Sequence, residues 1–161
     1  MIVLDTNVVS ELMRLRPEPI LVRWIRRQPV ASVWTTVVTV LELRFGIELL
    51  PHSKRRAQLE TALDRNLHED LGARILDFDR SAAHEAAVLA ARRQRAGLAM
   101  EFRDAESAGI VASRRATLAT RNIRHFENLA IELVNPWTEC SPIAKGGHHP
   151  MMMPARDTVV M

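Results

Sequence analysis

The chain has 161 residues, 47% of them hydrophobic, a composition that predicts a folded globular protein and excludes an intrinsically disordered one. A single cysteine, Cys140, excludes an internal disulfide framework, and without a signal-peptide pattern or a membrane-length apolar run we expect a cytoplasmic protein with no membrane partner. The net charge is only +3, and the clustered arginines suit phosphate or carboxylate groups but equally a solvated helix face.

The first half of the chain predicts two strands and four helices. Ile2, Val3 and Leu4 form a short apolar run, and two prolines, Pro17 and Pro29, bracket an amphipathic stretch. A β-branched segment then favours a strand, and helical periodicity follows it. The expected elements are a strand at 2–4, a helix to about residue 14, a helix at 17–28, a strand at 32–38, and helices at 41–50 and 54–69.

The second half continues this alternation. Asp79 and Ser81 can cap an alanine-rich helix that ends near Gly97. Strands that alternate with helices predict an α/β fold with a mostly parallel sheet. The other expected elements are a strand at 74–78, a helix at 104–113, and strands at 116–120 and 131–134.

The composition changes near the carboxyl end of the chain. From Pro142 onward no apolar periodicity remains, and Gly, His, Pro and Met are frequent. We therefore expect one domain over residues 1–138 and a flexible tail over residues 139–161.

Asp5 comes directly after the first apolar strand. Open α/β sheets bind their ligands outside the carboxyl ends of the strands, and an ionised carboxylate beside a sheet core needs a cation or hydrogen bonds. Asp5 can equally be the cap of the helix that follows. A phosphotransferase with an aspartate nucleophile also begins this way, but it needs a second acid where this chain has Asn7.

Two further acidic residues, Glu42 and Asp104, lie where a carboxylate can have either a structural role or a role as a ligand. Glu42 lies among apolar neighbours, so it either faces solvent, pairs with an arginine or points toward a ligand. Asp104 begins a predicted helix, where it can act as a cap or as a ligand. Two like charges at about 4 Å repel by about 4 kcal/mol at an effective dielectric constant near 20. Converging acids would therefore either become protonated in part or need a hard cation such as Mg²⁺ or Mn²⁺, which can activate water for attack on a phosphodiester.

Taken in order, these motifs resemble those of the PIN-domain ribonucleases, in particular the VapC-type toxins and their FitB-like relatives. The resemblance covers residues 1 to about 138. The residues that carry it are Ile2-Val3-Leu4-Asp5-Thr6-Asn7, Thr36-x-x-Thr39-x-x-Glu42-Leu43-x-x-Gly46, Asp104-Ala105-x-x-Ala108, Leu118-Ala119-Thr120-Arg121-Asn122-Ile123-Arg124-His125-Phe126 and Val134-Asn135-Pro136-Trp137.

The resemblance implies a three-layer α/β/α fold with a central sheet of about five mostly parallel strands. By motif position, Asp5, Glu42 and Asp104 match the catalytic and metal-binding acids of the family, with Mg²⁺ or Mn²⁺ as the cofactor. It also implies a metal-dependent endoribonuclease, the toxin of a type II toxin–antitoxin pair, which forms a homodimer and is inhibited by a cognate antitoxin. The residues that match polar positions near the acids or the RNA substrate are Thr6, Asn7, Thr120, Arg121 and Asn122.

One position departs from the family pattern. Many relatives carry a fourth acid at or shortly after the end of the fourth strand, where this chain has Asn122 and, three residues later, His125. Glu11, Glu101 and Glu106 are the candidates to replace that acid. Its absence leaves open a mechanism with one ion in place of two. It also leaves open a catalytically weak or inactive module that binds RNA or an antitoxin.

Overall fold

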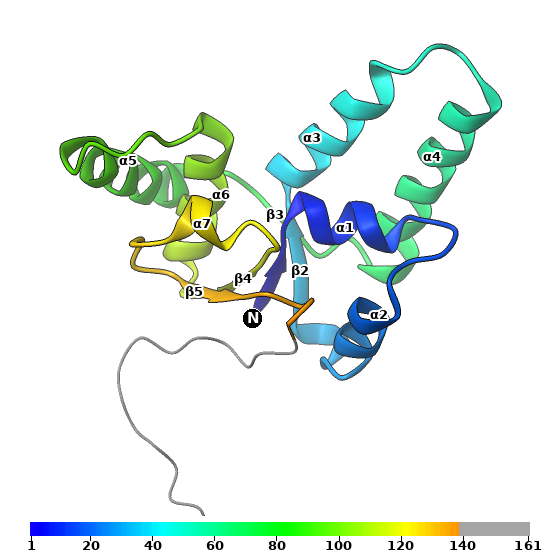
Figure 1. Cartoon of the computed structure of the whole chain (residues 1–161), viewed down its shortest axis with the longest axis horizontal. Coiled ribbons are helices and arrows are strands. Elements are labelled where there is room, and N and C mark those ends of the chain that lie inside the picture. The colour runs from blue at the N-terminus through cyan, green and yellow to red at the C-terminus, as the bar shows by residue number, and fades with distance from the viewer. Residues whose placement is uncertain (139–161) are drawn as a thin grey trace, which may run out of the picture.

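Strand β1 lies in the middle of a five-stranded sheet in which all neighbouring strands are parallel (Figure 1). The computed structural model describes residues 1–138, and the predicted flexible tail at 139–161 lies outside them. The strand order is β3-β2-β1-β4-β5, which confirms the predicted α/β fold with a parallel sheet. The strands are β1 (Ile2–Leu4), β2 (Val33–Thr36), β3 (Ile75–Leu76), β4 (Thr117–Ala119) and β5 (Glu132–Val134).

Helices cover both faces of the sheet and so confirm the expected three layers. Helices α1 to α4 lie on one side of it and α5 to α7 on the other (Figure 1). None of the helices in residues 1–138 is long and apolar enough to cross a membrane. The helices are α1 (Thr6–Leu12), α2 (Pro19–Arg26), α3 (Val37–Glu48), α4 (Lys54–Arg65), α5 (Arg80–Arg95), α6 (Phe102–Ser113) and α7 (Ile123–Phe126), with a 3₁₀ turn at Val30–Ser32 and a π-helical turn at Asn66–Asp70.

Neighbouring residues of β1 pack into two different cores. Val3 is buried with Ile110 of α6 in one core, and Leu4 is buried with Val8 and Leu63 in the other. Successive side chains of a strand point to opposite faces of the sheet, so this short strand joins both layers of helices. The first residues of the chain therefore fix the position of Asp5 firmly.

The second strand is shorter than the sequence predicted because a helix cap ends it. Thr36 is almost fully buried, and its hydroxyl oxygen accepts a hydrogen bond from the Thr39 amide at 3.0 Å. That bond satisfies one of the free amides at the start of α3, so Val37 and Val38 become helical although they are β-branched. Helix α3 thus begins four residues before the predicted start and carries Glu42 in its second turn.

Other boundaries also differ from the expected ones. The third strand pairs only over Ile75–Leu76, and α4 ends at Arg65 in a π-helical turn closed by the Leu71 amide on the Asn66 carbonyl. Helix α6 begins at Phe102, so Asp104 lies within its first turn. Helix α7 was not predicted, because four residues are too few to show a periodicity.

Candidate active site at the carboxyl ends of the strands

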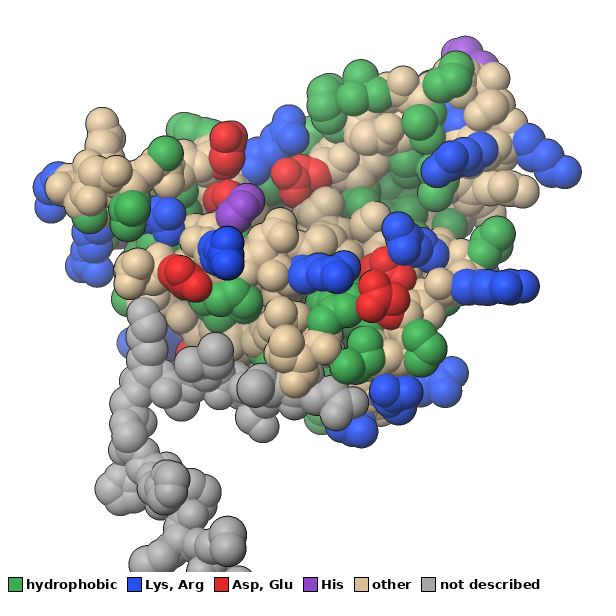
Figure 2. Space-filling model, in the orientation of Figure 1, with side chains coloured by type: hydrophobic (Ala, Val, Ile, Leu, Met, Phe, Trp, Pro, Cys, Tyr) green, Lys and Arg blue, Asp and Glu red, His purple; other side chains and the backbone are tan. Residues whose placement is uncertain are grey.

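An open pocket of about 700 Å³ lies where β1 and β4 end. The chain leaves β1 toward α1 on one side of the sheet and leaves β4 toward α7 on the other side, which is where open α/β sheets bind ligands. Acidic side chains gather in the hollow between α3 and α6 (Figure 2). The residues that line the pocket are Asp5, Thr6, Asn7, Ser10, Glu42, Glu101, Phe102, Arg103, Asp104, Asn122 and His125.

Asp5 occupies the cap position of α1, but its side chain makes no capping hydrogen bond. Its Oδ2 accepts hydrogen bonds from the Thr120 hydroxyl at 2.6 Å and from the Asn7 amide at 2.7 Å. Asn7 also accepts a hydrogen bond at 3.0 Å from the backbone amide of Arg121, which ties it to the loop after β4. This network holds the Asp5 carboxylate in one orientation at the floor of the pocket.

The acids of the pocket influence one another electrostatically. Burial raises the pKa of Asp5, and the charges of Glu42 and Asp104 raise it further, whereas hydrogen bonds from the Thr120 hydroxyl and the Thr6 amide lower it. Burial also raises the pKa of Asp104, and His125 lowers it. The charges of Glu42 and Glu101 add to the increase. A site in which several carboxylates disfavour each other's ionisation gains stability from a bound cation.

Glu42 reaches the pocket from α3 and has two partners there. The Thr6 hydroxyl donates a short hydrogen bond to its Oε2, and Arg103 lies 3.7 Å from its Oε1. The guanidinium of Arg103 also lies over the ring of Phe45, 5.4 Å from its centre. Glu42 is therefore both a pocket acid and the partner of an arginine, two roles that the sequence could not separate.

Asp104 reaches the pocket from the first turn of α6. Its Oδ2 lies 3.0 Å from Nδ1 of His125, a residue of α7 that also lines the pocket. Asn122 lies at the start of α7, and its backbone amide donates to the Thr120 hydroxyl at 3.0 Å. The position at which the sequence analysis expects a fourth acid thus holds an amide and an imidazole.

The candidate replacements for that acid lie in different places. Glu101 lines the pocket, whereas Glu11 is buried elsewhere, 3.1 Å from Arg14. Glu106 does not line the pocket. The side chain of Arg121 pairs with a glutamate of the α1–α2 loop at 3.7 Å and stacks on a tryptophan near the end of the domain, so only its backbone joins the hydrogen-bond network around Asp5.

Sequence reasoning missed three residues of the pocket. Ser10, Phe102 and Arg103 line it, and Phe102 is 79% exposed. Arg103 directly precedes Asp104 in the sequence, but only the packing of α6 against α3 brings it to Glu42. No sequence signal predicts which helix lies beside α3.

The donor set of the pocket fits a hydrated hard cation. Its acids offer oxygen atoms, which are the ligands that Mg²⁺ and Mn²⁺ prefer. Within residues 1–138 no three carboxylate, imidazole or thiol side chains converge closely enough to enclose one ion. Mg²⁺ is commonly held by one or two carboxylates and keeps several water molecules, so the arrangement suits an open site with water-mediated contacts.

Comparison with known protein families gives a match over nearly the whole described chain. The family model described as PIN domain matches residues 2–132. A plasmid stability protein, StbB of Pseudomonas syringae, is 39% identical over 137 residues, which cover 85% of this chain and 99% of that protein. The VapC ribonuclease Y4jK of Sinorhizobium fredii is 34% identical, with 85% and 98% covered, and the toxin FitB of Neisseria gonorrhoeae is 31% identical, with 85% and 99% covered.

Solved structures agree with this assignment. The crystal structure of FitAcB from Neisseria gonorrhoeae contains a chain that is 31% identical, with a TM-score of 0.77 over 85% of this chain and 99% of that one. VapBC-5 from Mycobacterium tuberculosis, a member of the VapBC family of toxin–antitoxin systems, contains a chain with 25% identity and a TM-score of 0.59, with 82% and 95% covered. The acids after β1, in α3 and in α6 thus lie on a fold shared with these proteins. The chain belongs to the PIN-domain family, and its relatives include VapC and FitB toxins.

Proposed function

We propose that the protein is a metal-dependent endoribonuclease that hydrolyses RNA phosphodiesters and acts as the toxin of a type II toxin–antitoxin pair. The observation that carries the proposal is the meeting of Asp5, Glu42 and Asp104, from three separate elements, in one pocket. The pKa of Asp5, raised chiefly by burial and further by the charges of Glu42 and Asp104, supports a site that a cation would stabilise. A relative named as a VapC ribonuclease supports RNA as the substrate.

In this proposal Asp5, Glu42 and Asp104 are the residues that would hold Mg²⁺ or Mn²⁺, directly or through water. When bound, such an ion would supply an activated water and offset the charge that develops on the phosphodiester. Thr120 and Asn7 orient the carboxylate of Asp5 through its Oδ2.

The remaining pocket residues have roles of their own. Arg103, beside Glu42, is placed to attract a phosphate at the mouth of the pocket. His125 holds Asp104 in position through its Nδ1. Asn122 offers an amide oxygen but no charge, so the donor set favours one firmly bound ion over two.

A single substitution with a matched control tests the catalytic proposal. Asp5→Asn should lower Mg²⁺-dependent cleavage of RNA at least about a hundredfold, because it removes a charged oxygen donor that an ion would need. Asp77→Asn, an exposed aspartate outside the pocket, should cleave RNA like the unaltered protein. Cleavage would be followed on labelled RNA by gel electrophoresis, with and without EDTA. Full activity of Asp5→Asn, or activity in EDTA, would contradict the proposal.

The second candidate function is a module that binds RNA or an antitoxin and has little or no turnover. The observation in its favour is that, of the described residues after β4, Asn122 and His125 but no acid line the pocket, where the family resemblance leads us to expect a fourth acid. Such a module would bind RNA equally well with and without Mg²⁺ and would cut none at any protein concentration. Cleavage of labelled RNA with and without EDTA therefore also separates the two functions.

We further propose that the protein forms a homodimer and binds a cognate antitoxin. The antitoxin proposal is supported by the related chain in a VapBC toxin–antitoxin system. The homodimer is supported by the α3 stripe, which we define as Leu41, Phe45 and Leu49. Leu41 and Phe45 belong to α3 and Leu49 is its C-cap; the three side chains are spaced four residues apart and are 55%, 49% and 69% exposed.

A further inference from the structure

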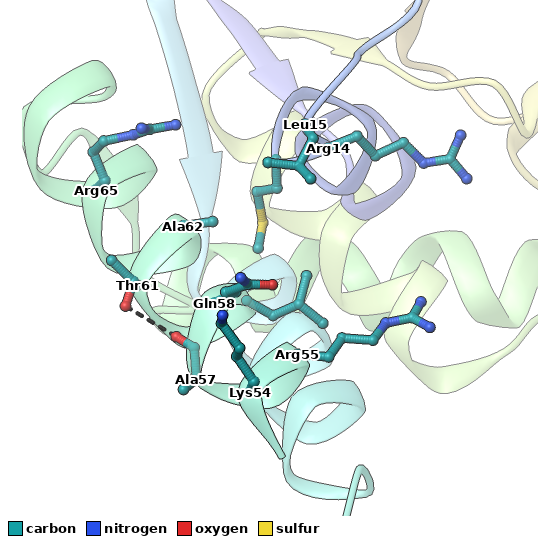
Figure 3. A pocket seen from close by; sticks show the side chains of 11 residues that line it. Arg14, Leu15, Lys54, Arg55, Ala57, Gln58, Thr61, Ala62 and Arg65 are labelled. Atoms are coloured by element: carbon teal, nitrogen blue, oxygen red, sulfur yellow. Dashed lines mark hydrogen bonds between the residues drawn. The ribbon is translucent and has the colours of Figure 1, made fainter.

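A second pocket, of about 740 Å³, lies between the end of α1 and helix α4 (Figure 3). Four basic side chains line it, and no acidic side chain does. We call it the basic pocket, and its cations are Arg14, Lys54, Arg55 and Arg65. All four are exposed, although Arg14 also pairs with the buried Glu11 at 3.1 Å. Figure 3 shows Arg14 and Arg55 extending on the same side of the pocket, with Arg65 farther along α4.

The position of two of these cations is unfavourable for the helix that carries them. Lys54 and Arg55 are the first two residues of α4, where the helix dipole is positive and a cation costs stability. Arg56, the next residue, pairs with two glutamates of the same region, at 2.6 and 2.8 Å. In the described part of the chain Lys54 and Arg55 have no such ion pair. Charged residues that lower the stability of their own helix and have no compensating ion pair are typical of a surface that binds a ligand.

Helix α1 connects the basic pocket to the acidic one. Asp5, Thr6 and Ser10 at its start line the acidic pocket, and Met13 and Arg14 at its end line the basic one. A helix of seven residues is about 10 Å long, so the two pockets lie within a few nucleotides of each other along an extended strand. From Lys54 to Arg65 the basic side chains follow α4 for about 16 Å, which suits a linear polyanion.

We propose that the basic pocket binds the phosphodiester backbone of the RNA strand whose scissile bond lies in the acidic pocket. This inference rests on the proposed ribonuclease function and adds to it a sequence-independent anchor for single-stranded RNA beside the cleavage position. Arginine forks match phosphate geometry, and continuity with the acidic pocket along α1 favours the strand over an acidic peptide.

The test compares the double variant Lys54→Gln, Arg55→Gln with its parent, both in an Asp5→Asn background so that RNA stays intact. Fluorescence anisotropy of a labelled short single-stranded RNA in EDTA gives the affinity at low and high KCl. Each lost phosphate contact lowers the salt slope of the logarithm of the affinity by about 0.7, so the double variant should lose about 1.4. Its melting temperature should stay equal or rise, because two cations leave the positive end of α4.

Arg92→Gln, Arg95→Gln is the matched control, because it removes the same charge from α5 on the other side of the sheet. It should keep the parent's salt slope.

Four outcomes have distinct meanings. A lowered slope in the double variant alone supports the inference. A parent-like slope in that variant, or a parent that binds no RNA, overturns it. If the double variant keeps its RNA affinity but no longer binds poly(glutamate), the pocket serves an acidic peptide and the inference is also overturned. A protein with an intact Asp5 that cuts no RNA ends the proposed function, while the affinities still report on the pocket.

Discussion

Asp5 shows how a single residue can serve a site at a cost to stability. Its carboxylate lies at the end of the central strand, accepts hydrogen bonds from Thr120 and Asn7, and carries a pKa raised by burial and by two other acids. In a capping aspartate the hydrogen bonds from helix amides dominate and lower the pKa, whereas for Asp5 burial outweighs the hydrogen bonds from the Thr120 hydroxyl and the Thr6 amide. Asp79, which caps α5 through the Ala82 amide at 2.9 Å, shows the capping behaviour.

The raised pKa predicts how stability depends on pH. The folded protein binds the Asp5 proton more tightly than the unfolded chain does, so this stabilisation is complete below the unfolded pKa of about 3.9. It is lost as the pH rises through the raised folded value. Asp5→Asn should therefore melt at a higher temperature than the unaltered protein at neutral pH. The difference should shrink toward acidic pH.

Thermal unfolding followed by circular dichroism between acidic and neutral pH measures this difference. Mg²⁺ should raise the melting temperature of the unaltered protein but not that of Asp5→Asn, because a ligand stabilises the state that binds it. Asp77→Asn should follow the unaltered protein in both respects. If Asp5→Asn were less stable than the unaltered protein at neutral pH, the ionised carboxylate would be stabilising the fold, contrary to its raised pKa.

At the scale of elements, two closely packed helices place Asp104. Helix α6 lies so close to α5 that a Cβ on Gly109 would come within 2.3 Å of the Ala82 carbonyl and 2.7 Å of the Ala86 methyl group. Contacts of that length require the helices to move apart. The position of Asp104 in the pocket therefore depends on Gly109, which allows α6 to pack closely against α5.

Replacing each of two helical glycines with alanine should change the free energy of unfolding in opposite directions. Gly109→Ala should destabilise the protein by about 1–3 kcal/mol, because overpacking outweighs the better helix propensity of alanine. Gly46→Ala, in α3 with open space around it, should stabilise by about 0.5–1 kcal/mol. Urea unfolding measures both. Equal effects of the two substitutions would show that the α5–α6 contact is looser than these distances indicate.

The sequence predicts the type and order of most elements but not their ends. Periodicity locates α3, yet only the buried hydroxyl of Thr36 explains why the helix begins at Val37. Motif order indicates Asp5, Glu42 and Asp104 as one group, whereas the partners of these acids depend on packing between elements far apart in the chain. For that reason Arg103 was not foreseen.

At the scale of the whole molecule, acidic and basic side chains line separate pockets, although the net charge is small. The acidic pocket lies between α3 and α6, the basic pocket lies along α4, and the α3 stripe is exposed and apolar. Each surface has a different proposed partner: a cation, a nucleic-acid strand and a second copy of the chain.

The proposed homodimer gives a prediction at this scale. Leu41→Asp should weaken self-association at least tenfold, about 1.4 kcal/mol, because it places a charge in an apolar contact. Sedimentation velocity over a range of protein concentrations measures the change. Val30→Asp alters an apolar residue outside the stripe that is 69% exposed, against 55% for Leu41, and should leave association unchanged. Unaltered association of Leu41→Asp would place the interface elsewhere.

The central place of β1 has a consequence for how the chain is made. Ile2 pairs with Val33 on one side and with Thr117 on the other, so the first strand completes its pairing only when β4 has been synthesised. A nascent chain on the ribosome therefore carries Asp5 well before Thr120 is synthesised. A chain that ends before β4 holds the acid without the hydroxyl that orients it, which delays the proposed activity until β4 has been added.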